Sequence, residues 1–515
     1  MKLLLLLILV SCSSAKKNDK QTNELNNYLN EHKVYEEVLS SEGQYIMVFN
    51  PKITPYIKEK LTKINLEKLE KEIAPALSIS LTDNNFTQAA ERLLKPEQKD
   101  ETNYDAVWVR DNAWIYFSFE KTNQKEKAKK LILALWDYYS SQDQWQRFID
   151  IIKSPELANE SKMNVPHIRF NGKSKEFKDV YEGDKPQLWN HRQNDAHGLF
   201  LLALSDAVNK KIIDGSEFSD ERKRILSLFP SYFDKINYAS FKGAGAWEEI
   251  DKVNTSSIAM VVKSLEAWRT LLRTNGQVKG NVSWSPSLIS KLIRNGYKTI
   301  DRQLSLGGEA PEQSPYDLSY RKEDAALFNL FLPWPLEKLS RDQKRLSITI
   351  LEKLERPFGI IRYKNDSYQG GNYWIAPKKS DTPELTGDAS SNNLYLSRFK
   401  NLIPHTEAQW FFDSKLSMIH SQLYQETIDP ILKEQEKYLA IYHFKRALGQ
   451  ITGKFDAEVI LAADGKEVRD LQIPESINTV IMDGKRFYLP SPITPLNWAK
   501  ASLAMAMIDL KKILD

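Results

Sequence analysis

Residues 245–272 read GAWEEIDKVNTSSIAMVVKSLEAWRTLL. In the second half of this stretch, apolar residues recur at the spacing of one helical face: Ile258, Val261, Val262, Leu265, Trp268 and Leu272. Asn254 or Thr255, just before them, can cap the first turn of that helix. The stretch therefore predicts a buried helix that follows an irregular loop.

The loop carries a tryptophan and two adjacent carboxylates, Trp247, Glu248 and Glu249. Loops held by a rigid scaffold are common places for binding and catalytic groups. The Trp247 ring can serve as a face for an apolar or sugar-like ring, and by excluding water it can raise the pKa of a neighbouring carboxyl. A carboxyl with a raised pKa suits general acid catalysis near neutral pH. The alternative is that both glutamates are solvated on an ordinary loop.

Helical patterns recur from about residue 35 to the C-terminus, and we count about a dozen helical segments. Residues 198–208 are apolar nearly all round, as in a buried inner helix, whereas a capping box at 340–343 opens an amphipathic one through 354. Strand-like alternation is limited to pieces such as 359–363 and 457–462. Three further helices are expected at 407–424, 427–448 and 497–514. We predict an all-α protein with inner apolar and outer amphipathic helices.

The composition excludes several classes of protein. The chain has 515 residues, 41% hydrophobic residues and twelve tryptophans, and its formal net charge is only +4 with no basic tract in its body. These values argue against a dedicated nucleic-acid binder. His191, His197 and His405 have no metal-ligand spacing, and phosphate-binding or dinucleotide motifs are absent from the sequence. We expect no metal and no cofactor.

The N-terminus has the pattern of an export signal. The apolar run Leu3–Val10 is too short to span a bilayer and is typical of a signal peptide. Leu9-Val10-Ser11-Cys12 resembles a bacterial lipobox, and Cys12 is the only cysteine in the chain. Cys12 is therefore the predicted lipidation site and membrane anchor. The alternative is a short signal peptide with an incidental cysteine.

The expected organisation has three parts. Residues 1–11 form a lipoprotein signal peptide, residues 12–34 a polar, flexible tether, and residues 35–515 a single catalytic domain. Ser13 stands where an aspartate would signal inner-membrane retention. The expected location is the bacterial cell envelope, on the outer membrane and facing the periplasm or the outside, and we expect a monomer.

A second polar loop, at residues 104–114, packs three aromatic residues around Arg110 and Asp111. An arginine offers a fixed fork of donors and an aspartate offers an acceptor, which together suit a vicinal diol. The alternative is a structural ion pair at the start of a helix.

A third polar loop, at residues 187–198, ends at the inner helix, and Asn194 or Asp195 can simply cap that helix. Residues 320–327 repeat this design, with charged side chains that lead into an apolar helix.

Taken together, these loops resemble family 15 glycoside hydrolases, the glucoamylase type, and the related phosphorylase kinase α/β regulatory subunits. The matching segments, in chain order, are Trp108-Val109-Arg110-Asp111, Arg192-Gln193-Asn194-Asp195-Ala196, Trp247-Glu248-Glu249 with Asn254-Thr255-Ser256-Ser257, and Asp324-Ala325-Ala326-Leu327. The second segment lacks a proline that is usual in the family, and the third contains a short insertion. The resemblance implies an (α/α)6 barrel, a six-hairpin toroid with long loops on one face, which agrees with the helix count.

The resemblance also implies roles. Glu248 is the general acid, Glu249 binds sugar, and Arg110 and Asp111 hold the sugar in the cleaved subsite. The complete set of expected substrate-binding residues is Trp108, Arg110, Asp111, Gln193, Asp195, Trp247, Glu249 and Arg321.

The family's chemistry is inversion, which needs a second carboxylate roughly 6.5–9.5 Å from the acid. The family places it in the loop before the last helix, here about residues 453–496. Pro474-Glu475 resembles the bacterial pattern, so Glu475 is the predicted general base. Glu407, which resembles a glutamate of bacterial members, and Glu467 are the alternatives.

Two functions compete. In the first, a lipid-anchored, exo-acting α-glucosidase releases glucose from the ends of oligosaccharides. In the second, a non-catalytic barrel of the regulatory-subunit type binds a glycan or a partner, since a fold alone does not fix a function.

Overall fold

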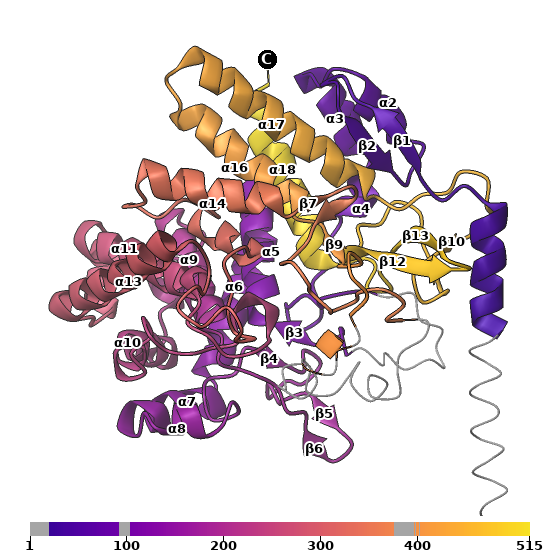
Figure 1. The fold of residues 1–515 in the computed structure, drawn as a ribbon. Coiled ribbons are helices and arrows are strands. Elements are labelled where there is room, and N and C mark those ends of the chain that lie inside the picture. The colour runs from indigo at the N-terminus through magenta and orange to yellow at the C-terminus, as the bar shows by residue number, and fades with distance from the viewer. Residues whose placement is uncertain (1–19, 92–102, 375–395, 397, 401, 515) are drawn as a thin grey trace, which may run out of the picture.

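The computed structural model describes residues 20–91, 103–374, 396, 398–400 and 402–514. Its helices alternate along the chain between an inner ring and an outer layer (Figure 1). The inner positions are α5 (Val109–Lys121), α9 (Asn194–Asn209), α11 (Thr255–Thr274), the 3-10 helix η3 (Ala325–Leu330), α16 (Asp413–Glu426) and α18 (Asn497–Lys511). The outer ones are α6 (Lys125–Ser140), α10 (Asp220–Lys235), α13 (Pro286–Leu306), α14 (Arg341–Lys353) and α17 (Pro430–Gly449), with α3 (Lys63–Glu72) and α4 (Ala74–Leu77) against α18.

The inner elements form a closed ring. α5 packs on α9, α9 on α11, α11 on η3, α16 on α18, and α18 returns to α5. The ring is completed between η3 and α16, where the Phe328 and Phe412 rings lie 5.5 Å apart. This is the predicted (α/α)6 barrel, with a short 3-10 helix at the fourth inner position.

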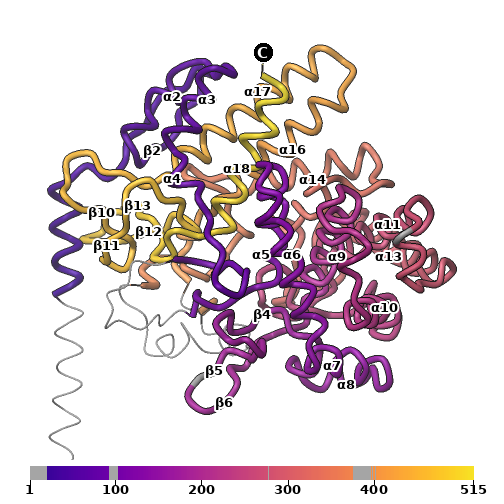
Figure 2. The backbone as a smooth tube through the Cα atoms, turned by 180° about the vertical axis from the view of Figure 1, so that it is seen from behind, coloured from indigo at the N-terminus to yellow at the C-terminus, as the bar shows by residue number. Residues whose placement is uncertain are grey.

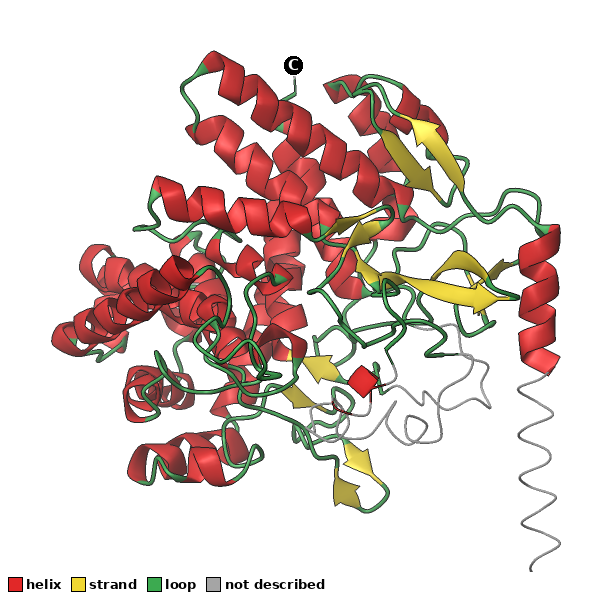
Figure 3. Ribbon diagram, in the orientation of Figure 1, coloured by secondary structure: helices red, strands yellow, loops and turns green. Residues whose placement is uncertain are grey.

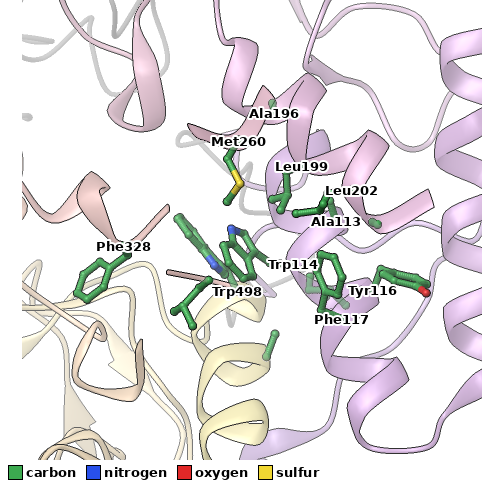
Figure 4. Close-up of a cluster of buried hydrophobic side chains, with 14 of the residues drawn as sticks. Ala113, Trp114, Tyr116, Phe117, Ala196, Leu199, Leu202, Met260, Phe328 and Trp498 are labelled. Carbon is green, nitrogen blue, oxygen red and sulfur yellow. The ribbon is translucent and has the colours of Figure 1, made fainter. Parts of the chain in front are cut away.

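Burial explains which helices are inner. Every side chain of α5 from Val109 to Phe119 is buried, and Figure 4 shows Trp114 of α5 and Trp498 of α18 within the shared core. Gly198 lets α9 approach α11, because a Cβ there would lie 2.7 Å from the backbone of Met260. By contrast, α14 buries one face only, and its predicted capping box between Ser340 and Gln343 is present.

Strands gather on the side of the molecule where the loops are long (Figure 3). A five-stranded sheet has the order β13-β12-β9-β8-β7. Its strands are β7 (Glu355–Arg356), β8 (Gly359–Ile360), β9 (Gln409–Trp410), β12 (Ser476–Met482) and β13 (Lys485–Pro490). The prediction of a loop over 453–496 therefore missed a hairpin, and the helix predicted to begin at 407 begins at Asp413, because β9 pairs with β8 and β12.

The remaining elements are short or peripheral. They are β1 (Glu36–Leu39), β2 (Tyr45–Val48), α2 (Thr54–Lys58), β3 (Val107–Trp108), α7 (Gln142–Lys153), α8 (Leu157–Glu160), β4 (Arg169–Phe170), β5 (Tyr181–Glu182), β6 (Lys185–Pro186), η1 (Gly215–Glu217), η2 (Gly245–Trp247), α12 (Gly276–Asn281), β10 (Ile460–Leu461) and β11 (Glu467–Val468).

The N-terminal segment differs from its prediction. Residues 20–31 form a helix that lies beside β10 and β13 (Figure 2). Its Leu25 and Leu29 are buried against Val480 and neighbouring apolar side chains. The expectation of a flexible tether therefore does not hold for residues 20–34. The predicted signal peptide and Cys12 lie outside the described residues, and no helix within the described part has the length and apolar run needed to cross a bilayer.

Candidate active site

A cavity of about 120 Å³ opens among the long loops. It is lined by residues from segments far apart in the sequence. Arg110 and Asp111 come from the first turn of α5, Glu248 and Glu249 follow η2, and Glu475 precedes β12. The structure thus brings the two charged loops into one cavity, as expected. Trp108 and Trp247 also line it.

The backbone around η2 aims the two adjacent glutamates in different directions. Glu248 has φ 61°, in the left-handed region that costs a non-glycine residue about 1–3 kcal/mol. Gly245 has φ 64°, and a Cβ there would lie 2.7 Å from the Asn254 side chain. That side chain does not cap α11 as predicted; it donates to the carbonyls of Gly243 and Lys252 and so holds the loop.

Glu248 lies in a pocket of aromatic and cationic groups. Its carboxylate accepts from Trp108 Nε1 at 3.4 Å and from Arg110 Nη1 at 3.3 Å. Burial raises the pKa of Glu248, although Arg110 and then Arg169 act against this. The group thus tends to keep its proton, as a general acid requires.

Glu249 has the opposite environment. It accepts from Arg362 Nη2 at 2.7 Å and from Tyr363 OH at 2.6 Å. Burial alone would raise the pKa of Glu249, but the positive charges of Arg362 and Arg321 outweigh it and lower the pKa. Two consecutive glutamates thus have pKa values shifted apart, an arrangement typical of sites that need one acid and one anion.

Two of the expected substrate ligands lie behind Arg110 rather than in the cavity. Asp195 accepts from Arg110 Nε at 2.7 Å, and Gln193 accepts from Arg110 Nη2. Neither residue lines the cavity. Asp195 does not cap α9 with its side chain either, so the alternative of a simple cap does not describe it.

Arg321 also lies outside the cavity. Its guanidinium stacks on the Tyr363 ring at 3.9 Å and lies 3.9 Å from Glu249. Asp111 does line the cavity, and burial raises its pKa to about 7.

Glu475 is the cavity carboxylate that the sequence nominates as a base. It accepts from Tyr104 OH at 3.0 Å and from Gln369 Nε2 at 2.5 Å. Burial raises the pKa of Glu475 to about 7, and these two hydrogen bonds counter that effect only in part. An inverting hydrolase needs this carboxylate ionised, and its burial acts against that state. Of the two alternatives, Glu407 accepts from the backbone of Asn365 outside the cavity, and Glu467 is exposed on β11.

The sequence reasoning missed part of the cavity wall. Further lining residues are Tyr104, Arg169, Trp189, Arg362, Tyr368, Tyr373, Trp374, Arg398, Trp410 and Trp498. Arg362, which forms two hydrogen bonds to Asp366 as well as one to Glu249, carries no motif around it. Among the described residues, no group of three or more His, Cys, Asp or Glu side chains could hold a metal ion.

A family model and two relatives match this chain. Residues 86–437 match the family model described as Glycosyl hydrolases family 15. Over 199 residues the chain is 35% identical to the uncharacterized lipoprotein YgeQ of Escherichia coli K12. This match covers 38% of this chain and 75% of that protein. A second match, 42% over 60 residues, covers 12% of this chain and 61% of the putative protein YgeP of the same organism.

Solved structures with a similar fold include two glycosidases. The glucoamylase from Saccharomycopsis fibuligera has a TM-score of 0.55 and 14% identity, covering 88% of this chain and 96% of that one. A glycosidase variant solved in complex with glucose has a TM-score of 0.54 and 14% identity, covering 88% of this chain and all of the other. At this identity the likeness establishes the fold alone.

Proposed function

Because the chain belongs to glycosyl hydrolases family 15, we propose that it is an inverting, exo-acting α-glycoside hydrolase that releases glucose from the ends of oligosaccharides. One observation carries the proposal. Glu248 and Glu475 come from segments that are far apart in the sequence, and both line the same cavity. The cavity also holds aromatic faces and charged donors suited to a sugar.

In the proposed reaction, Glu248 gives its proton to the glycosidic oxygen as the bond to the anomeric carbon breaks. Water attacks that carbon from the opposite face, and the Glu475 carboxylate takes a proton from the water. An α-linked substrate then yields a β-configured sugar. Arg110 and Asp111 bind hydroxyls of the sugar that is released, while Trp108 and Trp247 present faces to its ring.

The positions of the other expected ligands support an indirect role. Asp195 and Gln193 hold Arg110 in place, and Arg321 contributes to the charge around Glu249. We infer that these three act as positioning residues.

The test is hydrolysis of a panel of α-glucosides with the product anomer followed by NMR. Glu248→Gln and Glu475→Gln should each lower kcat by about 10²-fold or more, since each removes a group that moves a proton. Glu407→Gln is the matched control, because Glu407 is a buried glutamate outside the cavity and should leave the rate unchanged. Loss of activity in Glu407→Gln, with Glu475→Gln active, would move the base to Glu407.

The non-catalytic alternative has one observation in its favour. The pKa of Glu475, raised to about 7 by burial, leaves a substantial fraction without the charge that a base needs near neutral pH. Under this alternative the wild type binds oligosaccharide, cleaves nothing on the panel, and Glu248→Gln changes affinity alone.

We also propose that Cys12 carries a lipid and anchors the protein in the bacterial envelope. The lipobox-like residues 9–12 and the 35% identity to a protein named as a lipoprotein support this. Cys12→Ser should release the protein from the membrane fraction, as followed by immunoblot after fractionation. Retention of the variant in membranes would contradict the anchor.

A further inference from the structure

Arg169 is a buried cation in the cavity wall that the proposed reaction does not use. It lies on β4, directly opposite Trp108 on β3, and is only 3% exposed. Its guanidinium carbon lies 4.7 Å from the Trp108 ring centre and 4.2 Å from that of Trp189. Two indole rings therefore hold the guanidinium in a fixed orientation at the cavity.

Arg169 differs in its partners from Arg110 and Arg362, the arginines that bind Glu248 and Glu249. Arg110 is paired with Asp195, and Arg362 with Asp366 and Glu249. Within the described part of the chain, no carboxylate lies within 4.0 Å of the Arg169 guanidinium. Burying a charge without a close counterion costs free energy. Burial accordingly disfavours the charged form of Arg169 and lowers its pKa to about 10.

The hydrogen bonds of Arg169 leave donors of its guanidinium unused. Nη1 donates to Gln187 Oε1 at 2.6 Å, whereas the buried Nε has no partner among the described residues and is closed to solvent. Nη2 makes no hydrogen bond to a described residue either, and it is the donor that remains for an anion in the cavity. Gln187 thus fixes the rotation of the guanidinium while Nη2 stays unpaired among the described residues.

The position of Arg169 relative to Glu248 indicates where a ligand would meet it. Trp108 contacts both residues: its ring stacks on the guanidinium, and its Nε1 donates to Glu248. A general acid protonates the oxygen of the group that leaves. Arg169 therefore lies near the acid, and a group bound to it would be near the oxygen that Glu248 protonates.

We propose that this cavity takes a saccharide whose leaving-group sugar carries an anionic substituent, and that Arg169 binds that substituent. The inference rests on the proposed hydrolase function and narrows its substrate class. A carboxylate of a uronic acid and a phosphate ester share the chemistry that Arg169 would recognise. The anion would supply a close counterion, which no carboxylate of the described residues provides within 4.0 Å.

The experiment compares three disaccharides with the linkage that the wild type cleaves or binds best. One has glucose as the reducing-end sugar, one has glucuronate, and one has glucose 6-phosphate. For the wild type, kcat/KM and the Kd from calorimetry should favour an anionic disaccharide over the neutral one by at least about tenfold. The two anionic disaccharides show whether Arg169 binds a carboxylate or a phosphate.

Variants assign the preference to Arg169. Arg169→Gln should reduce the anionic-to-neutral ratio toward one, and Arg169→Lys should recover part of it because the charge returns without the fork. Arg224→Gln is the control, since Arg224 stacks on Trp145 at 5.0 Å outside the cavity and should leave the ratio unchanged. Thermal melts establish that each variant is folded.

The outcomes separate the two proposals. If no disaccharide is bound or cleaved, the hydrolase function itself fails. If the neutral disaccharide is cleaved as well as the anionic ones, the function stands and this inference is overturned. It is equally overturned if the anionic preference persists in folded Arg169→Gln; Arg169 would then only support the two tryptophans.

Discussion

Replacing Asp195 is the most informative test of the site, because Asp195 acts on Glu248 through Arg110 and does not itself line the cavity. Its carboxylate lies 2.7 Å from Arg110 Nε with its side chain 1% exposed. The substitution Asp195→Asn keeps the size of the side chain and removes the charge. Arg110 then retains Gln193, the Gly245 carbonyl and Glu248 as partners.

The expected cost in stability follows from burial. Removing one partner of a buried ion pair costs about 3–5 kcal/mol, and the partners that Arg110 retains place this case near 3 kcal/mol. An unfolding entropy of roughly 2.1 cal/mol/K per residue gives about 1 kcal/mol/K for a chain of this length, so Tm should fall by about 3 °C. The variant should therefore remain folded at assay temperature.

The expected effect on catalysis has a definite sign. Without Asp195, the positive charge of Arg110 is less compensated and lowers the pKa of Glu248, which burial had raised. A general acid works only while protonated, so activity is lost as pH rises through its pKa. The alkaline limb of the kcat/KM profile should therefore move to lower pH, as measured with an unactivated α-glucoside.

Asp206→Asn is the matched control. Asp206 is on the same helix, three turns or about 16 Å further along, and it contacts Tyr116 and Lys210 instead of the site. Its loss should lower Tm without moving the pH profile. If the alkaline limb of folded Asp195→Asn stays in place or moves to higher pH, Arg110 does not transmit charge to Glu248 as argued.

Two further predictions concern the base and the N-terminal helix. Tyr104→Phe removes a hydrogen bond that lowers the pKa of Glu475, so that pKa should rise further. Because a base must be ionised, the acidic limb of the rate profile should then move to higher pH. An unmoved acidic limb would indicate that Glu475 is not the base. Leu25→Ala deletes a core contact of the helix at 20–31, at a cost of about 2–5 kcal/mol, and should expose residues 20–31 to limited proteolysis while the barrel stays resistant. Unchanged cleavage would contradict independent docking of this helix.

The all-α architecture with inner and outer helices was predictable from hydrophobic patterns, whereas the (α/α)6 barrel followed from the resemblance to family 15 glycoside hydrolases. Residues 198–208 are apolar nearly all round, and the stretch after Asn254 has an apolar helical face, as buried inner helices require. The hairpin of β12 and β13 was overlooked although Asp483-Gly484 marks its turn, both with positive φ. The helix at 20–31 was missed for a different reason: only Leu25 and Leu29 mark its buried face.

The charged loops were predictable as a set, but the partner of each charge was not. Asp195 reads equally well as a helix cap and as a ligand, and its pairing with Arg110 depends on how α5 packs against α9. Arg169 and Arg362 have no flanking motif at all; each reaches the cavity through strand pairing or a loop position that only the tertiary structure defines. Sequence patterns thus identify residues that can do chemistry, and packing decides which of them meet.

The protonation states of the cavity decide between hydrolysis and binding. Inversion needs Glu248 protonated and Glu475 ionised in the same molecule, so the working pH must lie below the pKa of the first and above that of the second. Burial raises both pKa values, which moves this window to higher pH and places its lower edge near pH 7, the value to which burial brings Glu475. Arg169, which has no carboxylate within 4.0 Å among the described residues, adds a positive charge beside Glu248 that lowers the pKa of Glu248. An anion bound to Arg169 would offset that charge, raise the pKa of Glu248 and widen the window, so that the substrate group that gives affinity would also favour the catalytic protonation state.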